Sequence, residues 1–395
     1  MVILKLYLFK KERDFMDIEI LINQIDDHNE CNIIATKKFN PKCVIFIYKE
    51  ENKDLLDSLI KYYNNYLPNI KVIDYMIKEG DYLALNKVIN ENKNKKIVVN
   101  LSGGSRINSL QLLNICKVND IQSVYIDIKN KSLYTFDEEV NIVNEEFEEL
   151  ELERLVKASG GEVIVNTSDL SDKEDLIVLT RAIYKNLDLW HEYKQRLYDS
   201  NVFLHDRDNP KIIRIKSSLL NKKEFDILYS ILSKLKSMGG IEYNKENNDI
   251  IKVIFKNEYL KSFIFKSGTW LEVATKNIIE EIKEIDEVKS GVMFLWNDKS
   301  KKVKNEVDVI AVRDSIPICI SCKDSDKYNE DALNELDVYS KQLGGENAYK
   351  ILVATKEPIK LAVKDRAKEM GIGLIIFDGD EEKLKNNIRD FIKKS

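Results

Sequence analysis

The chain has 395 residues, 44% of them hydrophobic and 33% charged, and its formal net charge is -5 at pH 7. These values predict a globular protein of two or three domains, and they exclude a low-complexity chain and a protein that coats nucleic acid through bulk positive charge. No apolar run is long enough to cross a membrane, and residues 1–10 are followed by charge rather than by a small-residue cleavage site. We therefore expect a cytoplasmic protein that does not engage a membrane.

The first part of the chain, up to about residue 136, alternates short apolar runs with helical patterns. This rhythm is typical of a parallel α/β sheet. We expect strands over residues 18–22, 43–48, 70–75, 97–101 and 123–128. The apolar stretch at 1–15 is compatible with an added strand or with an upstream start codon.

Two polar loops follow strands of this sheet. In the first, Asn100-Leu-Ser-Gly-Gly-Ser-Arg106, the glycines permit a tight turn at a helix N-terminus, which favours an anion or a nucleotide but is also common as a purely structural turn. The second loop is Asp26-Asp27-His28-Asn29, and polar loops at strand ends form the ligand crevice of open α/β sheets. Neither the Walker A nor the G-x-G-x-x-G spacing is present, so ATP hydrolysis and dinucleotide redox chemistry have no support.

Residues 138–256 begin with an acidic stretch and continue into helical patterns. A helical stripe of Phe225, Leu228, Leu232 and Leu235 ends at Gly239-Gly240, and a strand follows over 249–255. Helix followed by hairpin predicts a winged-helix-like module. Because no basic recognition helix is evident, we interpret it as a spacer between two α/β domains rather than as a DNA reader.

The last part, residues 260–395, predicts a second α/β domain. A helix is expected over 270–285, strands over 291–296, 306–313, 317–323, 350–355 and 373–377, and covering helices over 332–343 and 359–370. The pair Cys319-x-x-Cys322 lies in an apolar strand without a second pair or a nearby histidine, so we expect buried thiols rather than a zinc site.

Acidic and basic residues gather on two strands of this second domain. Glu306 and Asp308 are two apart and share one strand face, and Ser321 and Lys323 share a face of the next strand. An antiparallel pair brings Asp308 close to Lys323, and Glu272 on the preceding helix can add a ligand. Carboxylates that hold Mg²⁺ or Mn²⁺ beside a lysine suit phosphodiester hydrolysis. Lysines 299, 301, 302 and 304 would meet substrate phosphates or form a solvated hairpin tip.

The segments Gly-Thr-Trp-Leu-Glu (268–272), Asn-Glu-Val-Asp-Val (305–309), Ile-Ser-Cys-Lys (320–323) and Tyr339-x-x-Gln342-Leu-Gly-Gly resemble the PD-(D/E)XK effector domain of CRISPR-associated CARF nucleases. The resemblance implies catalytic roles for Glu272, Asp308, Ser321 and Lys323, and metal binding by Glu272, Glu306 and Asp308. Ser321 stands where the wider superfamily has Glu or Asp. Either Glu306 replaces that carboxylate, or the site binds metal more weakly and prefers Mn²⁺.

The two polar loops of the first part resemble the CARF sensor domain, which has a short polar loop and later Ser/Thr-Gly-Gly-Ser/Thr-Lys/Arg. The resemblance implies a homodimer that binds one cyclic oligoadenylate, most often cyclic tetra-adenylate, across its twofold axis. The residues implied in ligand binding are Asp26, Asp27, His28, Asn29, Ser102, Gly103, Gly104, Ser105 and Arg106.

The family layout implies a Rossmann-like CARF domain at 1–145, a connector with a winged-helix-like module at 146–258, and a restriction-endonuclease-like domain at 259–395. We expect a nuclease of type III CRISPR defence that acts on DNA or RNA. The main alternative is a CARF-controlled, DNA-binding transcription regulator with an inactive nuclease-like domain; a third is a restriction or repair nuclease without messenger control.

Overall fold

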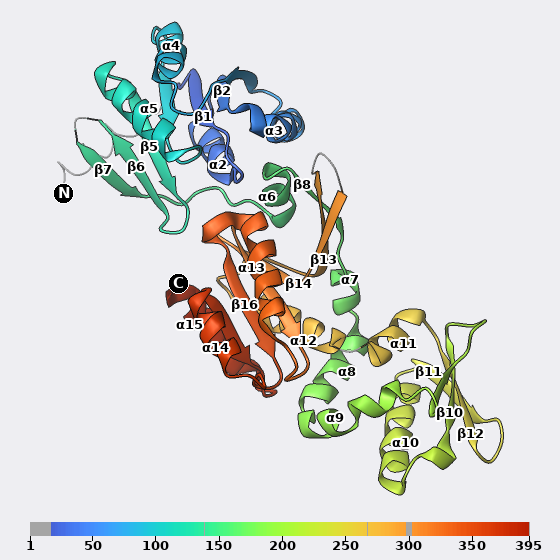
Figure 1. Ribbon diagram of the computed structural model, residues 1–395. Coiled ribbons are helices and arrows are strands. Elements are labelled where there is room, and N and C mark those ends of the chain that lie inside the picture. Colours follow the sequence, from blue (N-terminus) through green and yellow to red (C-terminus); the bar gives the residue numbers. More distant parts are fainter. Residues whose placement is uncertain (1–16, 138, 267, 298–301, 395) are drawn as a thin grey trace, which may run out of the picture.

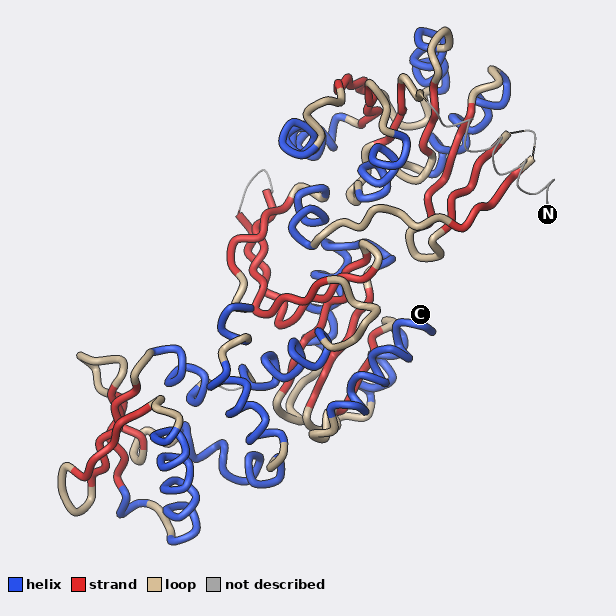
Figure 2. The backbone as a smooth tube through the Cα atoms, turned by 180° about the vertical axis from the view of Figure 1, so that it is seen from behind, coloured by secondary structure: helices blue, strands red, loops and turns tan. Residues whose placement is uncertain are grey.

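The computed structural model describes residues 17–137, 139–266, 268–297 and 302–394. Figures 1 and 2 show three lobes in a row, with the C-terminal α/β domain in the middle and the winged-helix-like module at one end. The interpretation of that module as a spacer between the α/β domains is therefore wrong. The two α/β domains touch directly, since Lys131 Nζ of the first lies 2.6 Å from Asp314 Oδ1 of the second.

The N-terminal domain is built on a seven-stranded sheet of order β3-β2-β1-β4-β5-β6-β7. The five predicted strands are confirmed and pair in parallel, and β6 and β7 add an antiparallel hairpin. The direction in which the chain adds strands reverses between β1 and β4. The bounds are β1 Ile20–Gln24, β2 Cys43–Tyr48, β3 Lys71–Met76, β4 Ile97–Asn100, β5 Gln122–Asp127, β6 Ser132–Phe136 and β7 Val140–Asn144.

Helices cover both faces of this sheet because its central strands β1, β2 and β4 are apolar on both sides. Leu21, Phe46 and Val98 face α2 (Glu30–Phe39) and α3 (Lys53–Tyr66), in a core that continues into the C-terminal domain. Ile22, Ile45 and Val99 face α4 (Tyr82–Asn92) and α5 (Arg106–Val118) in a second, separate core. Continuous apolar strands of this kind are typical of parallel sheets buried on both faces.

The connector between the N-terminal domain and the winged-helix-like module contributes a strand to the C-terminal sheet. After α6 (Leu152–Ala158), strand β8 (Gly161–Val165) pairs antiparallel with β13 and becomes an edge strand of the C-terminal sheet, which the sequence pattern does not predict. Helices α7 (Ser168–Ser171), α8 (Glu174–Tyr184) and α9 (Leu187–Tyr193) then run along the C-terminal domain.

The winged-helix-like module has the predicted helix and hairpin. Helix α10 (Lys222–Ser237) begins with a capping box formed by Asn221 and Glu224, and it packs Leu232 and Leu235 against the sheet. The sheet has four antiparallel strands in the order β11-β12-β10-β9. These are β9 Phe203–His205, β10 Ile212–Lys216, β11 Ile241–Lys245 and β12 Ile250–Phe255, and α11 (Glu258–Phe265) follows them.

The C-terminal domain is a six-stranded mixed sheet of order β17-β16-β15-β14-β13-β8. Its strands are β13 Glu287–Asn297, β14 Lys302–Arg313, β15 Ile316–Lys323, β16 Tyr349–Ala354 and β17 Ile372–Ile376, and its helices are α12 Thr269–Glu280, α13 Glu330–Gly344, α14 Ala362–Glu369 and α15 Glu381–Lys394. The predicted fold class, two α/β domains with a winged-helix-like module, is thus confirmed. Within the described ranges, no helix is long and apolar enough to cross a membrane.

Candidate active site and ligand crevice

Strands β14 and β15 bring the predicted catalytic residues together. Val307 and Val309 are buried, so Glu306 and Asp308 leave the opposite face of β14. Val309 pairs with Ile320 in the antiparallel register, which places Ser321 beside Asp308. Asp308 Oδ2 accepts a hydrogen bond from Cys322 N at 2.6 Å and lies 3.3 Å from Ser321 Oγ. One carboxylate oxygen is therefore held by the neighbouring strand.

These side chains line an open cavity of about 450 Å³. Its wall also includes residues from α12, α13 and the end of β15. The lining residues are Lys266, Gly268, Glu272, Glu306, Val307, Asp308, Ser321, Cys322, Lys323, Asp324, Ser325, Ala332, Glu335, Leu336 and Tyr339. All five residues predicted to carry catalysis or metal binding thus face one space, which is large enough for a phosphate group and a hydrated cation.

The electrostatics of the cavity are dominated by crowded carboxylates. Burial, and then the negative charge of Asp308, raises the pKa of Glu272 from its usual 4.5 to about 7, although Lys266 lowers it. Carboxylates that repel one another in this way are stabilised by a divalent cation. Glu272, Asp308 and Glu306 therefore fit a hard metal ion that takes one or two carboxylates and keeps several waters. Cys322, by contrast, is a buried thiol as expected.

The lysines expected near the substrate are only partly visible. Lys323 lies at the end of β15 and lines the cavity. Lys304 is exposed on β14, whereas Lys299, Lys301 and the side chain of Lys302 lie outside the described residues. Their suggested contact with phosphates stays a prediction.

The second polar site lies where β1 and β4 end, at the point where the strand order reverses. In doubly wound sheets this is the place of the ligand crevice, because the loops of the two strands diverge there. The loop after β4 is packed tightly: a Cβ at Gly103 would lie 2.8 Å from Gln24 O, and one at Gly104 would lie 2.6 Å from Gln24 Cβ. Gly104 also has φ of +80°. Both positions therefore require glycine.

Of the remaining residues of this loop, Ser102 and Ser105 form hydrogen bonds that hold the fold, and Arg106 lies on the surface. Ser102 Oγ donates to Asn100 Oδ1 at 2.7 Å and accepts from Ile126 N at 2.7 Å, so it ties the loop to β5. Ser105 is the N-cap of α5. Arg106 is exposed at the first turn of this helix, where its charge can reach an anion held by the helix N-terminus.

The loop after β1 does not present all four predicted residues to a ligand. Asn29 is buried, its amide nitrogen donates to Asp26 O at 2.6 Å and to Ala158 O at 3.3 Å, and its amide oxygen accepts from Asp26 N and Asn32 Nδ2. Its hydrogen-bonding groups are therefore used by the loop itself and by α6. Asp26 and Asp27 are partly or fully exposed and remain candidates.

His28 belongs to the contact between domains. A Cβ added to Gly345 would lie 2.8 Å from His28 Cδ2, so the imidazole packs against the main chain of the 3-10 helix η4 (Gly345–Asn347), directly after α13. Its neighbour Glu30 lines a small gap at the same contact together with Pro317 and Leu343. Burial raises the pKa of Glu30, with His28 acting against this effect. The candidate ligand loop thus touches the C-terminal domain.

A family comparison identifies the C-terminal part of the chain. Residues 259–395 match the family model described as Card1-like, endonuclease domain. This part of the chain is therefore similar to Card1-like endonuclease domains and is called the Card1-like domain below. A comparison with curated proteins finds no significant match.

Solved structures share the fold of the whole chain. The crystal structure of protein VC1899 from Vibrio cholerae has a TM-score of 0.74 at 19% identity, over 95% of this chain and 97% of its own. Can2 from Sulfobacillus thermosulfidooxidans, solved in complex with cyclic tetra-adenylate, has a TM-score of 0.70 at 15% identity, over 96% and 99%. A type III CRISPR defence DNA nuclease activated by cyclic oligoadenylate has a TM-score of 0.50 at 14% identity, over 86% and 46%. The chain thus shares the fold of these structures over most of its length, and its residues 259–395 match the Card1-like endonuclease model, in keeping with the predicted resemblance.

The Card1-like domain also contributes cavity residues that the strand motifs did not reveal. Glu335 and Tyr339 project from α13, and Tyr339 Oη donates to Glu335 Oε1 at 3.0 Å. Gln342, on the same helix, accepts from Asn305 of β14. The quoted segment Tyr339-x-x-Gln342 was the available signal, but only the packing of α13 over β15 shows that it reaches the cavity.

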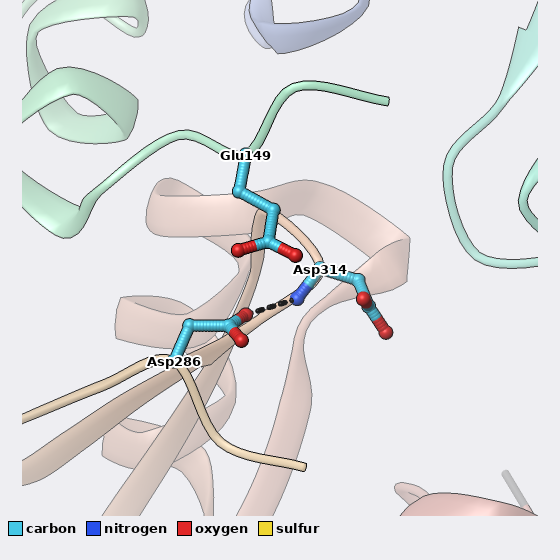
Figure 3. A group of neighbouring side chains, drawn as sticks. All are labelled: Glu149, Asp286 and Asp314. Atoms are coloured by element: carbon cyan, nitrogen blue, oxygen red, sulfur yellow. Dashed lines mark hydrogen bonds between the residues drawn. The ribbon is translucent and has the colours of Figure 1, made fainter. Parts of the chain in front are cut away.

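A separate acidic group lies at the contact between the N-terminal and Card1-like domains. Among the residues that the structure describes, Glu149, Asp286 and Asp314 have ligand atoms within 4.8 Å of one another (Figure 3). Asp286 Oδ2 accepts from Asp314 N at 2.7 Å, and Lys131 already supplies a positive charge to Asp314. Burial, followed by Asp286 and Asp314, raises the pKa of Glu149. This group was not predicted; its hydrogen bond lies within the Card1-like domain, and its ion pair with Lys131 belongs to the contact between domains.

Proposed function

We propose that this protein is a metal-dependent endonuclease of type III CRISPR antiviral defence, switched on by a cyclic oligoadenylate. The observation that carries the proposal is the cavity of the Card1-like domain, which gathers Glu272, Asp308 and Lys323 beside a direct contact with a CARF-like domain. Proteins of the same fold are described as bound to cyclic tetra-adenylate or as activated by cyclic oligoadenylate.

The cavity residues have separable tasks in phosphodiester hydrolysis of DNA or RNA. Glu272 and Asp308 would hold Mn²⁺ or Mg²⁺, with Glu306 at the edge, and the cation would polarise the phosphate and acidify a water. Cys322 N and Ser321 fix Asp308 by their hydrogen bonds. Lys323 places a positive charge where the phosphate gains negative charge. Glu272 must lose its proton to bind metal, so metal affinity falls as the pH drops below about 7.

The crevice at the ends of β1 and β4 is the proposed messenger site. Gly103 and Gly104 allow the loop at the start of α5 to pack against Gln24, the N-terminus of this helix favours negative charge, and Arg106 adds a positive charge. Asp26 and Asp27 would lie beneath the adenines. Asn29 holds the shape of the loop by its hydrogen bonds to Asp26 O and Ala158 O and does not bind the messenger.

We further propose a homodimer formed through α4 and α5. Large apolar side chains on these helices face solvent, including Leu83 (78% exposed) and Leu110 (63% exposed), with Ile107 beside the proposed messenger loop. An apolar face next to the crevice would bring two crevices to one twofold axis. A ring of four identical nucleotides has the same symmetry.

The contact between His28 and Gly345 gives the messenger a direct route to the cavity. The loop that carries His28 borders the proposed messenger site, and Gly345 directly follows α13, which supplies Glu335 and Tyr339 to the cavity wall. A ligand that prefers one position of this loop would bias the position of α13. The winged-helix-like module is not on this route, because it lies at the opposite end of the endonuclease domain (Figure 1).

Cleavage of supercoiled plasmid, single-stranded DNA and single-stranded RNA tests the proposal, with Mn²⁺ and with or without cyclic tetra-adenylate. Asp308→Ala should abolish cutting, whereas Asp365→Ala on the exposed face of α14 should not. Cutting that requires the messenger supports both sites. Cutting that is equal without it would refute the messenger role, and sequence-specific DNA binding without cutting under any ring size would favour a transcription regulator.

A further inference from the structure

The carboxylate of Asp324 is the centre of a buried hydrogen-bond network that the scheme above does not use. Its side chain is 1% exposed. The indole nitrogens of Trp190 and Trp270 donate to Oδ2 at 2.7 and 2.8 Å, and Thr355 Oγ1 donates to Oδ1 at 3.0 Å. With both oxygens satisfied by several donors, the carboxylate has one orientation.

A buried lysine provides the opposite charge. Lys194 Nζ lies 2.9 Å from Asp324 Oδ1, and it also donates to the main-chain oxygen of Asp324. Burial raises the pKa of Asp324, but the hydrogen bonds from Trp190, Lys194 and Trp270 outweigh this effect and hold the pKa below its usual value. Asp324 is therefore ionised at neutral pH. Removing one member of the pair would leave the other charge buried and uncompensated.

The network joins two elements that carry proposed catalytic side chains, α12 and β15, to the segment that carries Trp190 and Lys194. Trp270 lies two residues before Glu272 on α12, and Asp324 directly follows Lys323 at the end of β15. Lys194 begins the 3-10 helix η2 (Lys194–Tyr198), which follows α9 with its Trp190. The main chain is held at the same place, since Thr355 N donates to Lys323 O at 3.1 Å. This carboxylate thus links α12 to the end of β15, beside a second contact in which Cys322 Sγ of β15 lies 3.6 Å from Thr275 Oγ1 of α12.

We propose that Asp324 is a positioning residue for phosphodiester hydrolysis, which ties α12, β15 and α9 together and so sets the separation of Glu272 and Lys323. This inference rests on the proposed function. A buried ion pair adds little net stability compared with apolar side chains of the same volume. At this place the ion pair instead fixes one geometry of the surrounding elements. Such precision matters because a displacement of catalytic groups by about 1 Å can lower the reaction rate roughly a hundredfold.

The test compares Asp324→Asn with Asp337→Asn. The first keeps the shape of the side chain and removes its charge; the second removes the partner of Lys350, 2.8 Å away, in another partly buried pair of the same domain. We expect Asp324→Asn to lower kcat roughly 10- to 100-fold with KM nearly unchanged, and to weaken Mn²⁺ binding in calorimetry. In metal-free protein it should also change the fluorescence of Trp190 and Trp270. Asp337→Asn should lower only the melting temperature.

A double variant separates positioning from stability. Lys194→Met with Asp324→Asn removes the uncompensated charge, so the melting temperature should recover while kcat stays low. Recovery of kcat together with the melting temperature would overturn the inference, as would unchanged kcat and Mn²⁺ affinity in Asp324→Asn. If the unaltered protein neither binds Mn²⁺ nor cuts, the proposed function fails and this inference fails with it. If the unaltered protein cuts and the Asp324→Asn variant is equally active, only the positioning role of Asp324 is refuted.

Discussion

Replacing Glu272 by glutamine should stabilise the metal-free protein in a pH-dependent way. Folding raises the pKa of Glu272 from 4.5 to about 7, because burial and Asp308 disfavour its charge. The folded protein therefore favours the protonated carboxyl group. The folded protein has its full stability below about pH 4.5, where Glu272 is protonated in both the folded and the unfolded state, and it loses stability as the pH rises to about 7. At about 1.4 kcal/mol for each unit of pKa, the loss amounts to about 3 kcal/mol above pH 7. Glutamine does not ionise and avoids this loss.

Denaturant unfolding in EDTA at several pH values between 5 and 8.5 would measure the difference. All three tryptophans, Trp190, Trp270 and Trp296, lie in the Card1-like domain or against it, so their fluorescence follows the unfolding of the domain concerned. Glu369→Gln, on α14, is the control for an exposed carboxylate. A stability difference that stays constant from pH 5 to 8.5 would refute the reasoning. Added Mn²⁺ at pH 8.5 should stabilise the natural protein more than the glutamine variant.

Three further changes probe the messenger site, its contact with the endonuclease domain and the dimer. Gly104→Ala places a methyl group against Gln24, so activation by cyclic tetra-adenylate should fall at least tenfold in a plasmid-cutting assay, whereas Gly80→Ala, with similar φ but open space, should retain it. Gly345→Ala should place a methyl group against the ring of His28 and reduce the ratio of the cutting rate with messenger to that without it. An equal reduction of this ratio in Gly371→Ala, where the added methyl group has no neighbour within 4 Å, would contradict the coupling. Leu110→Glu should convert a dimer into monomers in analytical ultracentrifugation, and an unchanged mass would exclude the α4–α5 interface.

The direct contact of the two α/β domains changes the expected mechanism of control. A spacer module would have transmitted the signal over its own length. Instead, Lys131 pairs with Asp314 and the ring of His28 packs against Gly345, so we expect loop movements in one domain to reach the other without an intermediary. The position of α13 is the quantity that the messenger should change.

Local sequence patterns were sufficient for most secondary structure and for the catalytic strands. Apolar runs of five or six residues predicted the five parallel strands, of which β1, β2 and β4 are buried on both faces. The alternation of Glu306 and Asp308 with Val307 and Val309 predicted which carboxylates share a face. Glu272 reached the same cavity as expected, since helix and sheet bury their apolar faces against each other. These features depend on periodicity, which each segment carries in itself.

The tertiary structure alone decided the features that depend on distant segments. Strand β8 belongs to the Card1-like sheet, where it pairs with β13. Because β13 lies more than a hundred residues away in the sequence, no local pattern specifies this pairing. Asn29 is buried, and one acceptor of its amide nitrogen, Ala158 O, belongs to the distant helix α6. Asp324 looked like an ordinary charged residue after a strand until Trp190, Lys194 and Trp270 converged on it. Burial and hydrogen-bond partners are properties of the packed chain, and so the residues that hold the site in place could be recognised only once the chain was folded.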